Sequence, residues 1–377
     1  MLSRRVFLRD GAFALVSLGF APSFLARAMA ATAGTRRGKQ LIAIFQRGAV
    51  DGLSVVVPHG EAEYYRARPG IAIARPGSAN DAALDLDKFF GFNPRLAPLE
   101  PIWRRNDLAI VHACGSPNST RSHFDAQDYI ETATPGVKST EDGWLNRYLQ
   151  ARKLETESSF RAVALTQQMP RMLQGRAPAI AMSEIAQFDI RARTLNESFE
   201  AQYAAAADRV LNGTGRDAFD AMKTLRSADP ARYQPENGAD YPRTAFGQAL
   251  KQIGQLTKAD VGLEIAFADI GGWDTHVNQG SSQGQLATRL NDLSRSTAAL
   301  ITDLGERMAD TVVLTMSEFG RAVSENGNRG TDHGHGNAMM VIGGGVRHLG
   351  VTDAGPIFPG YTVKPANLPG LLGSRRV

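Results

Sequence analysis

The chain has 377 residues, of which 43% are hydrophobic and 21% charged, enough for one large buried core or two modest ones. The formal net charge is +4, but residues 1–30 hold four arginines and one aspartate, which is +3 of that total, so the rest is close to neutral. This balance argues against a nucleic acid or an anionic membrane surface as partner, and the single cysteine, Cys114, excludes an intramolecular disulfide.

The first 30 residues have the pattern of an export signal. Residues 3–10, SRRVFLRD, contain the paired arginines of a twin-arginine signal, and the apolar stretch 11–30 that follows is interrupted by Pro22 and Arg27. Ala28-Met29-Ala30 supplies a cleavage site, and no cysteine follows it to accept a lipid. We expect export through the twin-arginine translocase, cleavage near Ala30, a periplasmic or secreted mature chain and no stable membrane anchor. The competing interpretation is an amphipathic helix of a cytoplasmic protein.

Four apolar segments, each followed by polar residues, are expected to be buried strands: 41–45, 107–114, 261–270 and 310–318. Helical patterns lie between them, as in 285–308. Strands that are apolar on both faces and alternate with helices indicate a mostly parallel sheet covered on both sides, that is, an α/β fold with a three-layer α/β/α sandwich. The binding site of such a sheet lies at the carboxyl ends of its strands.

The mature chain, residues 31–377, is expected to be one domain. Residues 151–258 differ from the rest, with polar helical patterns and turn-rich stretches, and we interpret them as an insertion of helices and loops on the same core. A separate folded domain is the alternative. Beyond Gly345 the sequence lacks the helix expected to close the sandwich, which predicts a truncated or altered C-terminus.

Carboxylates, imidazoles and a hydroxyl recur in the loops at the predicted strand ends. Divalent cations bind carboxylate oxygens and imidazole nitrogens, and two cations close together need several carboxylates to offset their charge. Glycines in these loops let the backbone approach an ion closely. The set predicts a two-metal centre, and it comprises Asp51, Ser122 with His123, Asp274 with His276, Glu318, and Asp332 with His333 and His335.

Five segments, FQRGAVDGL, GSPNSTRSHFDAQDY, GGWDTHVNQG, TMSEFGR and GTDHGHGN, resemble in the same order those of the exported bacterial family known as domain of unknown function 1501. The resemblance covers roughly residues 40–347. That family is in turn similar to the alkaline phosphatase and sulfatase superfamily. The resemblance therefore implies an α/β/α sandwich with a bimetal site at the strand ends.

The resemblance also implies roles for individual residues. The nucleophile falls on Ser122, with Thr120 and Ser119 as neighbours that are able to replace it, and Arg121 is placed to hold a substrate oxyanion. Two departures concern the second metal: Phe319 stands where the superfamily has a histidine, and Asp274 and His276 are closer in sequence than usual. The implied metal ligands are Asp51, Asp274, His276, Glu318, His333 and His335.

The function implied is an exported hydrolase that cleaves phosphate or sulfate esters with one or two divalent metal ions, zinc being favoured over manganese, magnesium or calcium. Its substrate would be a small-molecule or polymer-borne ester. The alternative is a non-catalytic exported protein that keeps the fold and binds a metal for assembly.

Overall fold

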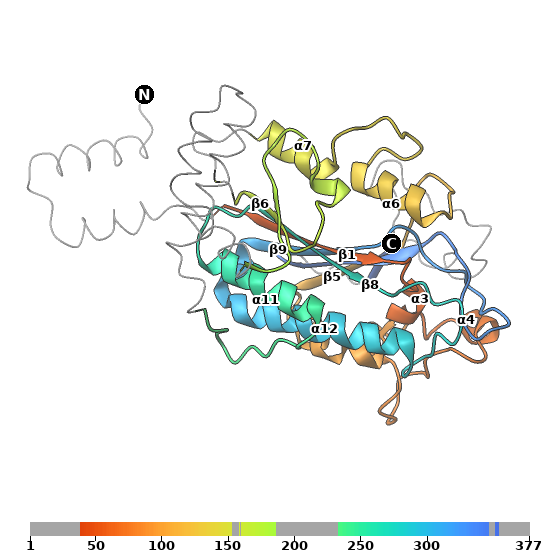
Figure 1. The fold of residues 1–377 in the computed structure, drawn as a ribbon. Helices are drawn as coiled ribbons and strands as arrows, with labels where there is room; N and C mark the ends of the chain where they lie inside the picture. The colour runs from red at the N-terminus through yellow and green to blue at the C-terminus, as the bar shows by residue number, and fades with distance from the viewer. Residues whose placement is uncertain (1–37, 153–157, 159, 186–232, 347–350, 354–377) are drawn as a thin grey trace, which may run out of the picture. The chain divides into compact units, whose positions relative to one another are not determined.

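The computed structural model describes residues 38–152, 158, 160–185, 233–346 and 351–353. The proposed signal, residues 1–30, lies outside them. Within the described residues a central sheet has the strand order β11-β5-β10-β9-β1-β8-β6-β7 (Figure 1). Its strands are β1 Gln40–Arg47, β5 Leu108–Cys114, β6 Ala162–Ala164, β7 Ile180–Ala181, β8 Ile265–Gly271, β9 Thr311–Met316, β10 Asn337–Gly343 and β11 Val351–Asp353.

The sheet is mostly parallel, as the sequence predicts. β1 pairs in parallel with β8 on one side and with β9 on the other, so that Ile44 lies between Ala268 and Thr315. The four predicted strands correspond to β1, β5, β8 and β9. β10 is the exception in direction, because it runs antiparallel between β5 and β9, and the sequence analysis does not predict it.

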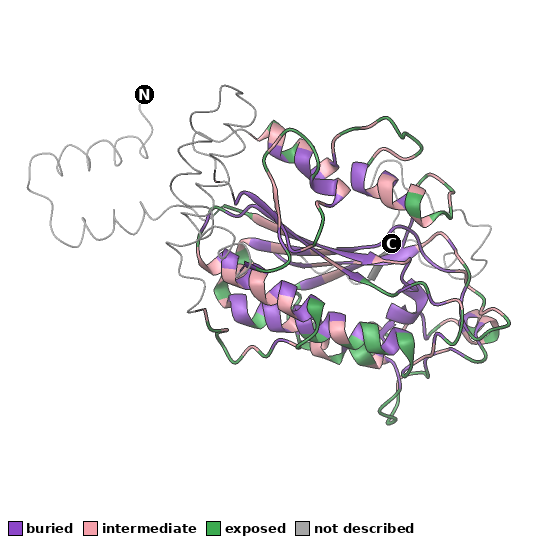
Figure 2. Ribbon diagram, in the orientation of Figure 1, coloured by how far each residue is buried: buried purple, intermediate pink, exposed green. Residues whose placement is uncertain are grey.

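Helices cover both faces of the sheet. α11, Ala245–Lys258, and α12, Gln285–Leu304, lie on one face, and α6, His123–Thr132, and α7, Trp144–Ala151, lie on the other (Figure 1). β1 shows why two layers are needed: alternate side chains of the strand belong to two separate cores. Figure 2 shows the buried strands between the two helical layers. The predicted three-layer α/β/α sandwich is confirmed.

The chain between β1 and β5 forms a small three-stranded sheet, ordered β2-β4-β3, and several short helices. This part of the chain matters for function because α3, the first helix after β1, packs beside β10. These elements are α3 Gly52–Val55, β2 Val56–Val57, α4 Ala62–Ala67, β3 Leu84–Asp85, β4 Gly91–Phe92, η1 Pro94–Leu99 and α5 Glu100–Arg104; two further 3₁₀ helices are η2 Arg171–Leu173 and η4 Gly305–Ala309.

The predicted insertion at 151–258 is wrong in part. β6 and β7 extend the central sheet through parallel pairing of β6 with β8, and α11 packs in the main core. The sequence analysis misses these strands because they are only three and two residues long, too short for a periodic pattern. Residues 186–232, which carry most of the polar helical pattern, lie outside the described residues.

At the other edge β11 pairs in parallel with β5. The prediction of an altered C-terminus concerns residues that the structure describes only in part, since 354–377 lie outside the described residues. In the described part of the chain, no helix combines the length and the apolar character needed to span a membrane.

Candidate functional site

The loops after β1, β5, β8 and β9 meet at one edge of the sheet. These four strands point the same way, because β1 is parallel to β8 and β9, and β10 is antiparallel to both β9 and β5. β10 therefore begins at the edge where the other four end. The loop of residues 329–337, which leads into β10, is brought to the carboxyl ends of the parallel strands, where sites of α/β sheets form.

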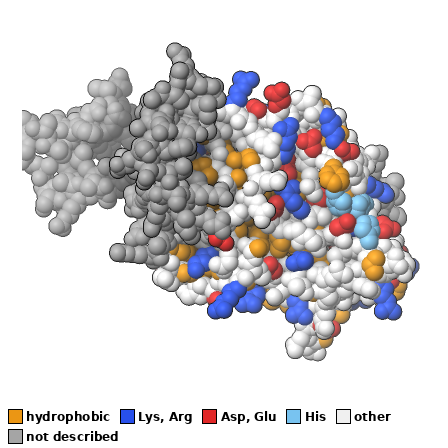
Figure 3. All heavy atoms as spheres, in the orientation of Figure 1, with side chains coloured by type: hydrophobic (Ala, Val, Ile, Leu, Met, Phe, Trp, Pro, Cys, Tyr) orange, Lys and Arg blue, Asp and Glu red, His pale blue; other side chains and the backbone are white. Residues whose placement is uncertain are grey.

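Three histidine rings from these loops turn the same nitrogen toward one point. Nε2 of His333 lies 3.1 Å from Nε2 of His123 and 3.0 Å from Nε2 of His276. The carboxylate of Asp274 completes the group, with one oxygen 3.0 Å from Nε2 of His276 and the other 3.5 Å from Nε2 of His123. Figure 3 shows histidine side chains together on the surface, with acidic side chains beside them. We call these four residues the His/Asp cluster.

The other nitrogen of each ring is held by an oxygen. Nδ1 of His123 lies 2.8 Å from Glu318, Nδ1 of His276 lies 3.1 Å from Asp332, and Nδ1 of His333 lies 2.8 Å from the carbonyl oxygen of Arg121. An acceptor at Nδ1 fixes the proton there, so a neutral ring directs the lone pair of Nε2 to the common point. Nε2 of His276 also has a hydrogen-bond donor nearby, because Nη1 of Arg321 lies 3.4 Å from it. The lone pairs of His123 and His333 repel one another unless a cation, or an additional proton, lies between them.

The geometry of the His/Asp cluster fits a divalent cation. Bonds of about 2.0–2.1 Å to a tetrahedral ion place neighbouring ligand atoms about 3.3 Å apart, and the separations observed are 3.0–3.5 Å. One ligand atom each from His123, Asp274 and His333 can be chosen with all separations within 4.8 Å, and this group of three does not include His276. A carboxylate and imidazoles held from behind are therefore arranged as metal ligands.

Electrostatics keep the carboxylate of Asp274 charged. Its partial burial alone would raise the pKa, but the hydrogen bond and charge of Arg321 outweigh burial and lower the pKa of Asp274 to about 2. The guanidinium of Arg321 is buried and also donates to the carbonyl oxygens of Gly48, Ala49, Trp273 and Thr331. Arg321 thus joins three loops of the site and positions Asp274, which is the one carboxylate of the His/Asp cluster.

Glu318, a predicted ligand, lies one step behind the His/Asp cluster. Its buried carboxylate accepts hydrogen bonds from Nδ1 of His123, from Gln127 and from the backbone N–H of Gly48. Burial would raise the pKa of Glu318, but the hydrogen bonds from His123 and Gln127 lower it below the usual range. The same contact raises the pKa of His123, which makes that ring a stronger base and a better ligand.

Asp51, predicted as the first-strand ligand, is not part of the His/Asp cluster. Its carboxylate is fully buried and accepts two hydrogen bonds from Arg68, at 2.6 and 2.9 Å, and one each from Ser54 and Gln279 at 2.7 Å. Both oxygens are thereby occupied by protein donors. The structure corrects this assignment: a strand-end position alone does not reveal a buried arginine 17 residues away.

We expect Asp51→Asn to lower the free energy of unfolding by about 3–5 kcal/mol, because it leaves the Arg68 guanidinium buried without its anion. Burial would raise the pKa of Asp51, but Arg68 lowers it, so the ion pair stabilises the protein above about pH 4 and is lost only as pH falls through the lowered pKa. Denaturant unfolding measures the effect. Metal content of the folded variant should match the wild type; a variant of normal stability without metal would restore Asp51 as a ligand.

His335 and Phe319 both lie beside the His/Asp cluster, and neither belongs to it. The His335 ring packs against Gly115, where a Cβ atom would come within 2.6 Å of it, and it lines a cavity beside the His/Asp cluster. The buried ring of Phe319 lies 4.9 Å from the rings of both His123 and His333. Phe319 therefore forms an apolar wall behind the ligands. Among the described residues, the structure shows one ligand group rather than the predicted pair.

The hydroxyls proposed as nucleophiles lie on the loop from β5 to α6. Ser122 is the N-cap of α6 and accepts a hydrogen bond from the N–H of Asp125 at 3.4 Å, directly before the ligand His123. Thr120 accepts from the N–H of Ser122 at 3.2 Å. Ser119 and Arg121 line the cavity. The structure places all of them next to the metal-binding edge and assigns the nucleophile to none.

His123 belongs to the His/Asp cluster, whereas the sequence analysis includes it in the two-metal set without naming it as a metal ligand. The signal was present, since His123 stands beside the proposed nucleophile at the start of a helix that follows a predicted strand. Two other ligands, Asp274 and His276, lie together after β8, and His333 comes from the glycine-rich loop before β10.

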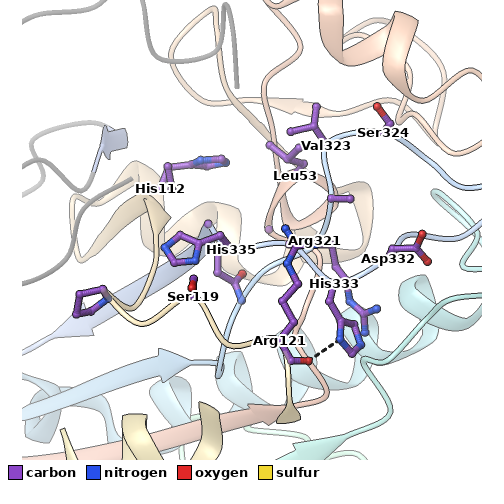
Figure 4. A pocket seen from close by; sticks show the side chains of 17 residues that line it. Leu53, His112, Ser119, Arg121, Arg321, Val323, Ser324, Asp332, His333 and His335 are labelled. Atoms are coloured by element: carbon purple, nitrogen blue, oxygen red, sulfur yellow. Dashed lines mark hydrogen bonds between the residues drawn. The ribbon is translucent and has the colours of Figure 1, made fainter. Parts of the chain in front are cut away.

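A cavity of about 710 Å³ opens beside the cluster (Figure 4). His333, Asp332 and Arg321 form the wall next to the metal-binding point, and Leu53 and His112 belong to the lining as well. A space of this size takes a small organic molecule.

Comparison with known proteins yields one family and a distant likeness in structure. Residues 109–356 match the family described as protein of unknown function DUF1501. No curated protein matches. The C-terminal periplasmic domain of EcEptC from Escherichia coli is similar with a TM-score of 0.38 at 10% identity, covering 83% of this chain and 74% of that one. Its complex with Zn is similar with a TM-score of 0.38 at 9% identity, covering 82% and 74%.

The matched residues include every ligand of the His/Asp cluster, the start of α6 and the histidine loop, whereas the segment that holds Asp51 and Arg68 lies before them. The match spans well over half of the chain, in agreement with the segments that carry the resemblance. The chain belongs to the DUF1501 family.

Proposed function

We propose that the protein is an exported metal-dependent hydrolase of phosphate or sulfate esters. The observation that carries the proposal is the convergence of three Nε2 atoms and the Asp274 carboxylate next to a loop that bears hydroxyls and an arginine. Both elements are needed for this chemistry, since an ester of an oxyacid must be held by positive charge and attacked by an oxygen nucleophile.

In this proposal the Ser122 oxygen attacks the phosphorus or sulfur atom while the bond to the ester alcohol breaks, and the alcohol leaves with the proton that the hydroxyl gives up. Water then cleaves the seryl ester and restores the hydroxyl. Thr120 and Ser119 are the next candidates for the attacking residue. Arg121 lies exposed on the cavity wall and binds the non-bridging oxygens of the ester. Arg321 positions Asp274 instead, because its guanidinium already donates to five acceptors. A divalent cation at the cluster supplies a Lewis acid that offsets negative charge on the reacting oxygens.

The ligand set favours zinc. Imidazole nitrogens suit zinc, whereas magnesium and calcium prefer oxygen ligands only, and the cluster offers three nitrogens to one carboxylate. We therefore propose one zinc ion per chain.

Elemental analysis combined with an ester assay tests the proposal. The purified mature protein should contain about one equivalent of zinc and release a chromogenic alcohol from phosphate or sulfate esters. Chelator-treated protein should be inactive and recover when zinc is added. Zinc without turnover across a broad ester panel would contradict the hydrolase.

Zinc binding without turnover of any ester would favour a non-catalytic metal-binding or assembly protein. Two observations support this alternative: Asp51 is bound by Arg68, and Phe319 replaces a histidine of the implied second metal site. A two-metal mechanism would need ligands that neither residue provides.

Export through the twin-arginine translocase is part of the proposal and rests on the sequence of residues 3–10. Replacement of both Arg4 and Arg5 by lysine should retain the precursor in the cytoplasm, because the translocase recognises the arginine pair. Cell fractionation with an antibody measures the distribution. Normal accumulation of the mature double variant in the periplasm would contradict this route.

A further inference from the structure

The cavity beside the His/Asp cluster has a polar rim and an apolar floor. Its exposed rim carries Ser119, Arg121 and Asp332. Its floor is made by buried Leu53 and by Ala113, which is likewise buried at the end of β5. Figure 4 shows Leu53 beside Val323. The cavity therefore combines an apolar part, made by Leu53, Ala113 and Val323, with the charged side chains of Arg121, Arg321 and Asp332.

The imidazole of His112, which also lines the cavity, is uncharged. Nε2 of His112 donates to the carbonyl oxygen of Val56 at 3.0 Å, and the ring lies 5.0 Å from the ring of Phe90. Burial lowers the pKa of His112 below its usual value, so the ring is neutral at pH 7. A charged or heavily hydroxylated group placed there would lose hydration without finding a charged partner.

The floor of the cavity is formed by residues that pack tightly against other elements of the fold. Gly52 opens α3, and a Cβ atom at this position would come within 2.8 Å of the backbone of Ala338 in β10. Leu53 and the partly buried Val323 also pack with Tyr64 in a small separate core. The apolar end of the cavity is thus fixed by β10 and by the chain after β1.

We infer that the cavity holds the organic group of the ester, and that this group is an extended apolar alkyl or aryl group which lies against Leu53 and Val323 while the oxyanion stays at the rim. The inference rests on the proposed function, since it names the substrate class of that site. An apolar group covers the floor and releases its water, and each methylene so buried strengthens binding.

Binding of alkylphosphonates to the zinc-loaded protein tests the inference without requiring turnover. Calorimetry should show that hexylphosphonate binds about tenfold or more tightly than methylphosphonate. Val323→Phe, which fills the floor, should abolish this difference. Val323→Asp should abolish it as well, by placing a charge in the floor.

Val137→Phe is the matched control, because Val137 is 45% exposed and does not line the cavity. It should keep the full dependence on chain length. The melting temperature of each variant shows that it is folded. Equal binding of the two phosphonates to the wild type, absence of binding by both, or a dependence that survives in both Val323 variants would overturn the inference. Chain-length dependence without turnover of any ester would instead refute the hydrolase and retain the ligand class.

Discussion

His333→Ala should remove the bound metal. Nε2 of His333 lies within 3.1 Å of Nε2 of both His123 and His276, and His333 belongs to the group of three side chains that are able to hold one ion. We expect the affinity for zinc to fall on the order of 10²-fold or more, and the zinc content after dialysis to fall from about one equivalent to near zero. Ester turnover and the stabilisation that zinc gives the folded protein should disappear together, because metal-binding energy is also folding energy.

Glu318→Gln is the matched comparison, since this residue touches the ligand His123 and not the metal-binding point. Loss of its charge should weaken zinc binding by about 10–100-fold, less than loss of a ligand. Competition with a coloured chelator measures both affinities. Unchanged zinc affinity in His333→Ala would rule out the cluster as the metal site.

Ser122→Ala should lower ester turnover on the order of 10⁴-fold or more, if Ser122 is the nucleophile, while the zinc content stays at the wild-type value. The same change removes the N-cap of α6, which costs about 1 kcal/mol of stability and lowers the melting temperature. Steady-state assays with one chromogenic ester, at a temperature well below the melting transition, separate the two effects.

Two further substitutions distinguish nucleophile from cap. Ser122→Asn retains a capping oxygen and lacks the hydroxyl, so it should be stable and inactive, whereas Ser122→Thr keeps both groups and should retain measurable activity. Full activity in Ser122→Asn would transfer the role to Thr120 or Ser119. Inactivity that tracks only the loss of stability would leave Ser122 as a structural cap.

The layers of the fold could be predicted because long buried strands and amphipathic helices carry periodic patterns. β1, β5, β8 and β9 are apolar on both faces, and α12 repeats its buried positions over 20 residues. β6 and β7 are too short to show a period. The place of β10 in the sheet is set by pairing with β5 and β9, which are far from each other in sequence.

The candidate site was predictable where the glycine-rich loops follow predicted strands, as at Asp274, His276 and His333. It was not predictable where a distant side chain decides the role. From the sequence, Asp51 and Glu318 are both expected to be strand-end ligands. In the structure Asp51 forms an ion pair with Arg68, and the carboxylate of Glu318 contacts Nδ1 of His123. Sequence position predicts the edge of the sheet, and only packing decides which group belongs to the His/Asp cluster.

The span of the ligands along the chain has a consequence for when the metal is acquired. His123 and His333 are 210 residues apart, and His333 reaches its place only when β10 has entered the sheet between β5 and β9. A partly synthesised or partly folded chain thus presents scattered histidines and no coordination sphere. If the protein is exported already folded, the cytoplasmic metal pool, and not that of the periplasm, decides which ion each molecule carries when it leaves the cytoplasm.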